Sequence, residues 1–193
     1  MAARLEALGA PAAGIVDTHG AWGHVSWEKR LKDSSVAPLY GAEFRWRRED
    51  GHLATFWALA EELPDFYRFA SAAPHDATSL ANRRGVVVFA GAALTDPEHF
   101  DFIDINPRSR LRTEHALALA RRTEKPVVIT GDNDYPAPGD RDRYLAWNDS
   151  RKMTPQHICD EEELRRAMWY VPERVWRAAV RNTNELATRL AGQ

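Results

Sequence analysis

The sequence predicts one α/β domain over residues 1–193, in which short buried strands alternate with helices. Two segments, 85–89 (GVVVF) and 126–130 (PVVIT), are the clearest strands, because runs of β-branched residues favour an extended backbone. Between them, 111–122 carries alanines and leucines at helical spacing. A helix followed by an apolar strand is typical of a parallel sheet buried on both faces, so we expect parallel strands.

The first half of the chain opens with a helix over 2–8, which Gly9 is suited to end in a left-handed conformation. The apolar run 13–16, which leads into Asp17, predicts a buried strand. The expected elements that follow are a turn at 20–23, a helix at 25–32, strands at 36–44 and 53–59, a helix at 65–72 and a linker at 73–84.

The second half continues the alternation. Besides the strands 85–89 and 126–130, it contains a strand at 100–105 after a proline-containing turn. We expect helices at 111–122, 141–148, 161–168 and 173–190.

Composition argues against several classes of protein. With 44% hydrophobic and 28% charged residues, the chain is expected to fold. A formal net charge of -2 gives no general attraction to nucleic acid. Arginines gather at 45, 47 and 48 and again at 108, 110, 112, 121 and 122, and each group is either a solvated face or a phosphate-contacting surface.

The single cysteine and the lack of signal-peptide and membrane-span patterns predict a cytoplasmic protein without membrane contact. Cys159 is the only cysteine, which excludes an internal disulfide and a thiolate metal cluster and fits a reducing compartment. The N-terminal residues 1–11 lack the apolar core of a signal peptide, and no window approaches the roughly 20 apolar residues of a membrane span.

Polar residues follow three of the predicted strands. They are Asp17-Thr18-His19, Glu43, and Asp132-Asn133-Asp134. Because functional groups in α/β sheets collect at the carboxyl ends of strands, these side chains are a candidate site for divalent cations. The alternative is structural, since aspartate is also a common helix N-cap and Asp-Asn-Asp before a proline makes a good turn.

The other histidines are His24, His52, His75, His99, His115 and His157. They have no metal-ligand spacing among themselves, so we expect surface or capping roles for them. The chain contains neither a phosphate-cradling glycine loop nor a Gly-x-Ser-x-Gly motif.

An ordered set of segments resembles the PHP (polymerase and histidinol phosphatase) domain of the bacterial DNA polymerase III alpha subunit. LEALGAPAAGIVDTHGAWGHVSWEKRLKDSSVAPLYGAEF is similar to the segment in which one strand ends in Thr-Asp-His-Gly and the next in Gly-x-Glu-Phe. PVVITGDNDYPAPGD resembles the strand followed by Asn-Asp-x-His-Tyr, and MTPQHICDEEELRRAM and VPERVWRAAVRNTNELATRL are similar to the segments that close the domain. The resemblance implies a distorted, incomplete (β/α)7 PHP-type barrel with C-terminal helices.

The resemblance also implies a site for divalent metals, namely Zn²⁺, Mn²⁺ or Mg²⁺, with Asp17, His19, Glu43, Asp132 and Asp134 as ligands. The sequence departs from the family at four positions. The first-strand His-x-His motif would precede Leu5, Thr18 takes the place of a ligand histidine unless a gap restores His19, Asp134 replaces another histidine, and Arg108 falls near a fourth. We therefore expect a degenerate site in which metal binding is weakened or lost, with Arg108 as a phosphate-binding or charge-neutralising group.

The resemblance implies a role in DNA replication. The chain is expected to be a non-catalytic or weakly catalytic module, without polymerase activity, that associates with a replicative polymerase or its accessory subunits and with DNA. The alternative is an active metal-dependent phosphoesterase of the 3′-5′ exonuclease, phosphatase or pyrophosphatase type. A split polymerase piece and a gene remnant are further possibilities that the sequence leaves open.

Overall fold

The computed structural model describes residues 1–18, 20–48, 50–72, 74–90, 97–131, 133–146 and 156–192. Its strands are β1 (Ala12–Thr18), β2 (Ala37–Arg47), β3 (Leu53–Ala60), β4 (Val86–Ala90), β5 (Phe102–Ile105) and β6 (Val127–Ile129). Its α-helices are α1 (Ala2–Ala7), α2 (His24–Leu31), α3 (Leu63–Ser71), α4 (Ala77–Ala81), α5 (Arg110–Thr123), α6 (Arg141–Leu145), α7 (Glu161–Ala167) and α8 (Glu173–Ala191). Two short 3-10 helices are η1 (Pro97–His99) and η2 (Pro138–Asp140).

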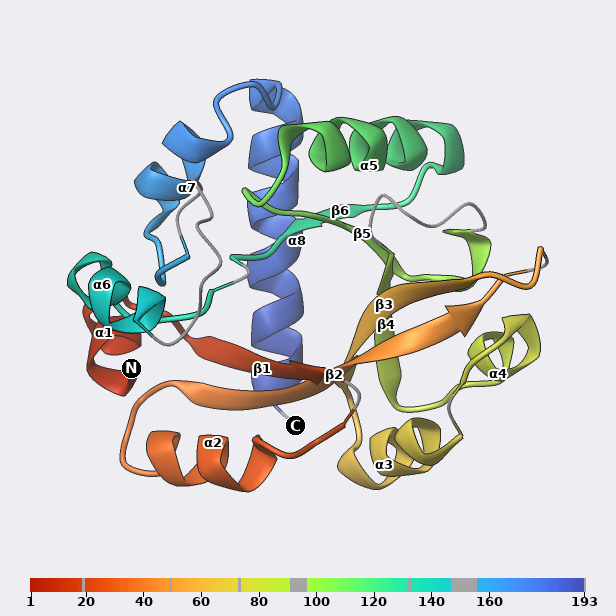
Figure 1. Ribbon diagram of the computed structural model, residues 1–193, viewed down its shortest axis with the longest axis horizontal. Helices are drawn as coiled ribbons and strands as arrows, with labels where there is room; N and C mark the ends of the chain where they lie inside the picture. The colour runs from red at the N-terminus through yellow and green to blue at the C-terminus, as the bar shows by residue number, and fades with distance from the viewer. Residues whose placement is uncertain are drawn as a thin grey trace.

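The six strands form one curled sheet in the order of the chain, from β1 to β6 (Figure 1). The pairs β1–β2, β4–β5 and β5–β6 are parallel, whereas β3 is antiparallel to both of its neighbours. The expected parallel sheet is therefore wrong at β3. A parallel crossover needs a dozen or more residues, and the connection between Arg47 and Leu53 is too short for one. The architecture is a mixed α/β half-barrel, consistent with an incomplete α/β barrel.

Each face of the sheet carries its own core. We call one the Phe44 face; it packs against α3, α4 and α5, and its central residues are Ala42, Phe44, Phe56, Ala58, Phe66, Phe69, Leu80, Val88, Ile103 and Ile105. We call the other the Leu39 face, and its cluster consists of Leu39, Leu59, Val87, Phe89 and Val128 with Leu186 and Leu190 of α8. A third cluster packs α1 and α2 against β1 through Leu5, Trp27, Leu31 and Val36.

Most of the predicted elements are confirmed within a few residues, and Gly9 has the expected left-handed conformation, with φ of 67°. The linker predicted at 73–84 is wrong in part, because it contains α4. The Asp76 carboxylate accepts a hydrogen bond from the backbone N–H of Ser79, and the Ser79 hydroxyl accepts one from the N–H of Asp76. This capping box, together with the fully buried Leu80, stabilises a short helix. The helix expected at 141–148 is described only to residue 146.

No helix in the described part of the chain combines the length and the apolar composition that crossing a membrane requires.

Candidate functional site

The antiparallel placement of β3 leaves β1, β2, β4, β5 and β6 running in one direction, so that their carboxyl ends meet at one edge of the sheet. Thr18, the last residue of β1, pairs with Glu43, which lies four residues before the end of β2 at Arg47 and so does not end its strand as expected. His19 and Asp132 lie outside the described residues. The predicted ligands whose positions can be compared are therefore Asp17, Glu43 and Asp134.

Glu43 projects from the Leu39 face. Successive side chains of a strand alternate between faces, and the neighbouring Ala42 and Phe44 belong to the cluster on the opposite side. Its partner across the sheet is Trp57, which packs against the Leu39-face cluster and stacks on Phe89 with ring centroids 3.6 Å apart. The Glu43 carboxylate is therefore half-buried and lies beside the stacked rings of Trp57 and Phe89.

Asp17 projects from the other face of the sheet. One oxygen of its carboxylate accepts a hydrogen bond from the backbone N–H of Gly23 at 2.5 Å. Ile15, two residues earlier and thus on the same side, packs with the cluster that holds α2. Asp17 therefore anchors the start of α2, and β1 does not present it on the same face as Glu43.

A buried carboxylate that the sequence analysis missed lies at the end of β5. Asp104 is 7% exposed, and its two oxygens accept hydrogen bonds from Thr130 Oγ1 at 2.7 Å and from Asn106 Nδ2 at 3.1 Å. Because Ile103 and Ile105 belong to the Phe44-face cluster, alternation places Asp104 on the same face as Glu43. The signal in the sequence was a single carboxylate inside the apolar strand FIDI.

Asp134 and Arg108 follow β6 and β5 respectively. The carboxylate of Asp134 accepts a hydrogen bond from the side-chain amide of Gln156, whose backbone carbonyl accepts one from the N–H of Asp134 at 2.7 Å. Arg108 is exposed, and its backbone N–H donates to Asn106 Oδ1 at 3.1 Å in the loop that leads into α5. Asp134 thus joins the end of β6 to the segment that precedes α7.

A different group of residues satisfies the distances needed for metal binding. Among the described residues, one group of three potential ligands has donor atoms within 4.8 Å of one another, and it consists of His157, Cys159 and Glu163. Asp17, Glu43 and Asp134 form no such group there. Sequence reasoning missed this cluster, because Cys159 was considered only with other thiols and His157 only with other histidines.

Burial and hydrogen bonding act oppositely on the pKa values of two cluster members. Burial raises the pKa of the Cys159 thiol to about 11, and the negative charges of Glu163 and Asp160 add to the effect. The backbone N–H of Asp160 lowers the pKa of Glu163, and the side chain of His157 contributes in the same direction. The cluster thus combines a protonated thiol with an ionised carboxylate at neutral pH.

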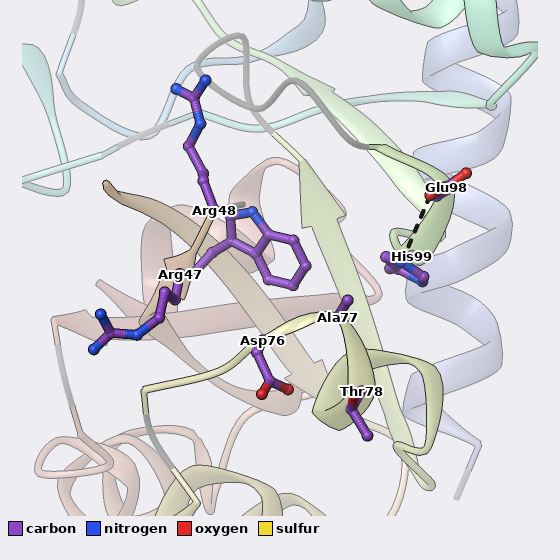
Figure 2. Close-up of a pocket in the computed structure, with 8 residues that line it drawn as sticks. Arg47, Arg48, Asp76, Ala77, Thr78, Glu98 and His99 are labelled. Atoms are coloured by element: carbon purple, nitrogen blue, oxygen red, sulfur yellow. Dashed lines mark ion pairs between the residues drawn. The ribbon is translucent and has the colours of Figure 1, made fainter. Parts of the chain in front are cut away.

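A separate hollow of about 280 Å³ lies beyond the end of β2 (Figure 2). Its lining consists of Trp46, Arg47, Arg48, Asp76, Ala77, Thr78, Glu98 and His99. The Nε1 of Trp46 and the Nε of Arg48 are buried without a hydrogen-bond partner among the described residues. Two arginines are balanced here by two carboxylates, so the net charge of the lining selects neither anions nor cations.

A comparison with protein-family models finds no match to this chain, and a comparison with curated proteins finds none either. The arguments below therefore rest on the sequence pattern and on the geometry.

Proposed function

We propose that the chain is a PHP-like module of a replicative DNA polymerase system, and that it acts as a binding module with little or no catalysis of its own. The ordered resemblance of the segments, which include the strand that carries Glu43, supports the proposal. A curled sheet that gathers the carboxyl ends of five strands at one edge is compatible with it.

The observation that carries the non-catalytic half of the proposal is the orientation of Asp17. Its carboxylate accepts the Gly23 N–H on the side of the sheet opposite to Glu43. On the Glu43 side, both oxygens of Asp104 already accept hydrogen bonds from Thr130 and Asn106. A phosphoesterase metal centre needs several convergent ligands with held geometry, and Asp17, Glu43 and Asp134 do not fit that requirement.

The second candidate is the metal-dependent phosphoesterase. It is favoured by Glu43 and Asp104, two carboxylates that project from one face of the sheet, on β2 and β5 with β3 and β4 between them. In this function a divalent metal would activate water and bind the phosphate, and Glu43 is the described residue on which activity would depend most.

One assay separates the two functions. Purified full-length chain is incubated with a chromogenic phosphodiester and added Mn²⁺, beside the Glu43→Ala variant and a no-metal blank. We expect wild type and variant to hydrolyse the substrate equally slowly, at the rate of the Mn²⁺-containing buffer. A manganese-dependent rate at least tenfold above that of Glu43→Ala would replace our proposal with the phosphoesterase.

The proposed association with a replicative polymerase is tested independently of catalysis. The immobilised chain is exposed to purified replicative polymerase alpha subunit and, separately, to the sliding clamp, at physiological salt. We expect retention of the polymerase or the clamp. Failure to retain either protein would overturn the replication role, whatever the outcome of the hydrolysis assay.

A further inference from the structure

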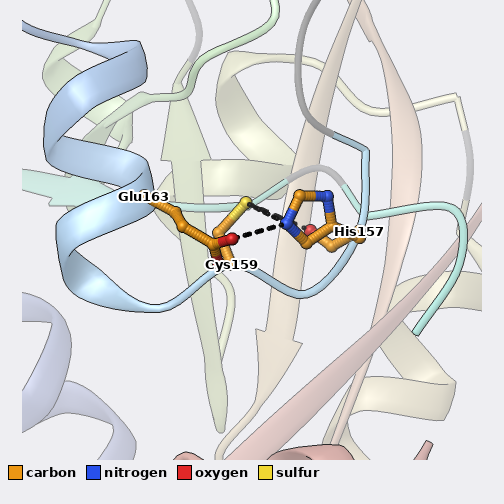
Figure 3. A group of neighbouring side chains, drawn as sticks. All are labelled: His157, Cys159 and Glu163. Carbon is orange, nitrogen blue, oxygen red and sulfur yellow. Dashed lines mark hydrogen bonds and ion pairs between the residues drawn. The ribbon is translucent and has the colours of Figure 1, made fainter. Parts of the chain in front are cut away.

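Three potential metal-ligand atoms, one nitrogen, one sulfur and one oxygen, converge beside the N-terminus of α7. Figure 3 shows the Cys159 sulfur and the Glu163 carboxylate directed at the same ring nitrogen of His157. The Nε2 of His157 lies 3.3 Å from Glu163 Oε1 and 3.6 Å from Cys159 Sγ. The side chains of His157 and Glu163 are 12% and 24% exposed, so the cluster is partly shielded from solvent.

The two distances from His157 Nε2 match edges of a zinc tetrahedron. Bonds from Zn²⁺ of about 2.0–2.2 Å to nitrogen and oxygen and about 2.3 Å to sulfur place tetrahedral N and O ligands roughly 3.4 Å apart, and N and S roughly 3.6 Å apart. A direct N–H···O hydrogen bond is usually shorter, about 2.9 Å. The spacing from His157 to Glu163 is therefore long for a hydrogen bond and close to that of two ligands sharing one ion.

The carboxylate of Glu163 is held in the orientation that a ligand requires. Its Oε2 accepts hydrogen bonds from the backbone N–H of Asp160 at 3.0 Å and from Arg4 Nη2 at 3.4 Å. Oε1 remains directed at His157. Such outer contacts orient metal ligands in proteins, and here they leave Oε1 directed at the imidazole.

We propose that His157 Nε2, Cys159 Sγ and Glu163 Oε1 bind one Zn²⁺ ion. One nitrogen, one sulfur and one oxygen donor suit this borderline ion, whereas Mg²⁺ and Ca²⁺ prefer oxygen ligands throughout. Three protein ligands leave a fourth position for water. Binding exchanges the thiol proton of Cys159 for the metal, and that proton passes to the buffer.

Glu43 is not a member of this ligand group, and the proposed zinc site is independent of the proposed function. Through Arg4, which donates to Ile158 O at 3.3 Å and contacts Glu163, it connects α1 with the segment leading into α7. The three proposed ligands lie within one short segment, so bound zinc would fix the segment leading into α7, which Arg4 joins to α1 across 154 residues of sequence.

The test uses full-length protein that has been stripped with a chelator. Zinc is titrated against a chromophoric indicator, and Co²⁺ is added separately to reveal a thiolate-to-cobalt charge-transfer band. We expect one ion per chain and the charge-transfer band. The Cys159→Ala variant should lose the band and bind zinc at least tenfold more weakly, with an unchanged far-ultraviolet circular dichroism spectrum.

Two matched carboxylate variants complete the experiment. Glu163→Gln retains a side chain suited to the capping box of α7 and should bind zinc at least tenfold more weakly. Glu162→Gln, the same change at the exposed neighbour that pairs with Arg166, should bind within twofold of wild type, and so should Glu43→Ala. Wild-type affinity equal to that of Cys159→Ala, or a cobalt complex without the thiolate band, would overturn the site.

Discussion

His75 is a histidine held in the interior of the Phe44-face core. It is fully buried and stacks on Phe69 with ring centroids 3.9 Å apart. Its Nδ1 lies 3.4 Å from Ser79 Oγ, and its Nε2 has no partner among the described residues. Burial lowers the pKa of His75 from 6.5 to about 4, and the nearby charge of Asp76 opposes this only in part. The ring is therefore neutral at physiological pH.

This buried ring should make stability depend on pH. Between pH 6.5 and about 4 the unfolded chain binds a proton at His75 that the folded chain does not. The stability that neutral, buried His75 contributes is therefore complete above pH 6.5 and falls as the pH decreases toward 4. The total loss from this residue is roughly 3 kcal/mol. Urea unfolding of wild type and His75→Phe at pH 4.5 and pH 8 measures it, and the variant should lose less stability than wild type between the two pH values. Equal losses would contradict the assignment.

The burial of His24 and His75 overturns the surface or capping roles expected for these two residues. His24 is 3% exposed, its Nε2 lies 3.0 Å from Gly41 O, and its Nδ1 lies 3.3 Å from Tyr67 Oη. The partners are 17 and 43 residues away in the sequence. Because they come from β2 and α3, local pattern could not reveal that this histidine would be buried with both nitrogens paired.

At the scale of elements, the start of α2 depends on a contact from β1. The Asp17 carboxylate accepts the Gly23 N–H, and a Cβ added to Gly23 would approach Ile15 Cδ1 to 2.6 Å. Gly23 is therefore packed closely against β1, and a side chain there would require Ile15 and Asp17 to shift.

Replacing Asp17 by alanine should destabilise the fold by about 1–3 kcal/mol, because the Gly23 N–H loses a charged acceptor. Urea unfolding measures the difference, with Thr18→Ala, an exposed neighbour in the same strand, as the control expected to change little. Added Mn²⁺ should leave the Asp17→Ala difference unchanged. A manganese-dependent stabilisation of wild type that disappears in Asp17→Ala would show instead that Asp17 is a metal ligand.

The two wrong predictions about helices and strands, the linker at 73–84 and the direction of β3, have local physical causes. The segment 73–84 resembles a loop in composition, yet Asp76 and Ser79 form a capping box and Leu80 adds a fully buried side chain. The direction of β3 follows from a short connection rather than from its residues, since an apolar strand has the same pattern in either direction. Strand positions could thus be predicted, whereas pairing direction required the length of the connection to be considered.

For the molecule as a whole, the sequence placed Asp17 and Glu43 on neighbouring strands correctly, and Asp17 lies one residue before the end of β1. The expectation that Glu43 ends its strand is wrong, because β2 continues to Arg47. Which face each presents depends on a one-residue difference in register, because side chains alternate. Thr18, not Asp17, pairs with Glu43. The His157, Cys159 and Glu163 cluster instead depends on how the loop before α7 folds onto the first turn of that helix.

The longest helix connects the parts of the molecule. Trp176 and Ala179 in the first half of α8 belong to the Phe44-face cluster, whereas Leu186 and Leu190 near its end belong to the Leu39-face cluster. The helix also contacts β6, β1 and β2, including both edge strands of the curled sheet (Figure 1). Each core therefore needs α8, which is the physical basis for expecting the two cores to unfold together.

Leu186→Ala tests this coupling. Leu186 is 8% exposed, and removing its buried methyl groups should lower the free energy of unfolding by about 2–4 kcal/mol, through lost burial and the cavity left behind. Leu111→Ala, at a position 62% exposed on α5, is the control and should change stability little. If residues 1–193 are one domain, tryptophan fluorescence, which includes Trp46 and Trp176 of the Phe44-face cluster, and far-ultraviolet circular dichroism should shift to the same lower urea midpoint. A midpoint lowered in only one signal would mean that the two cores unfold separately, because a single cooperative unit cannot lose stability on one face while retaining it on the other.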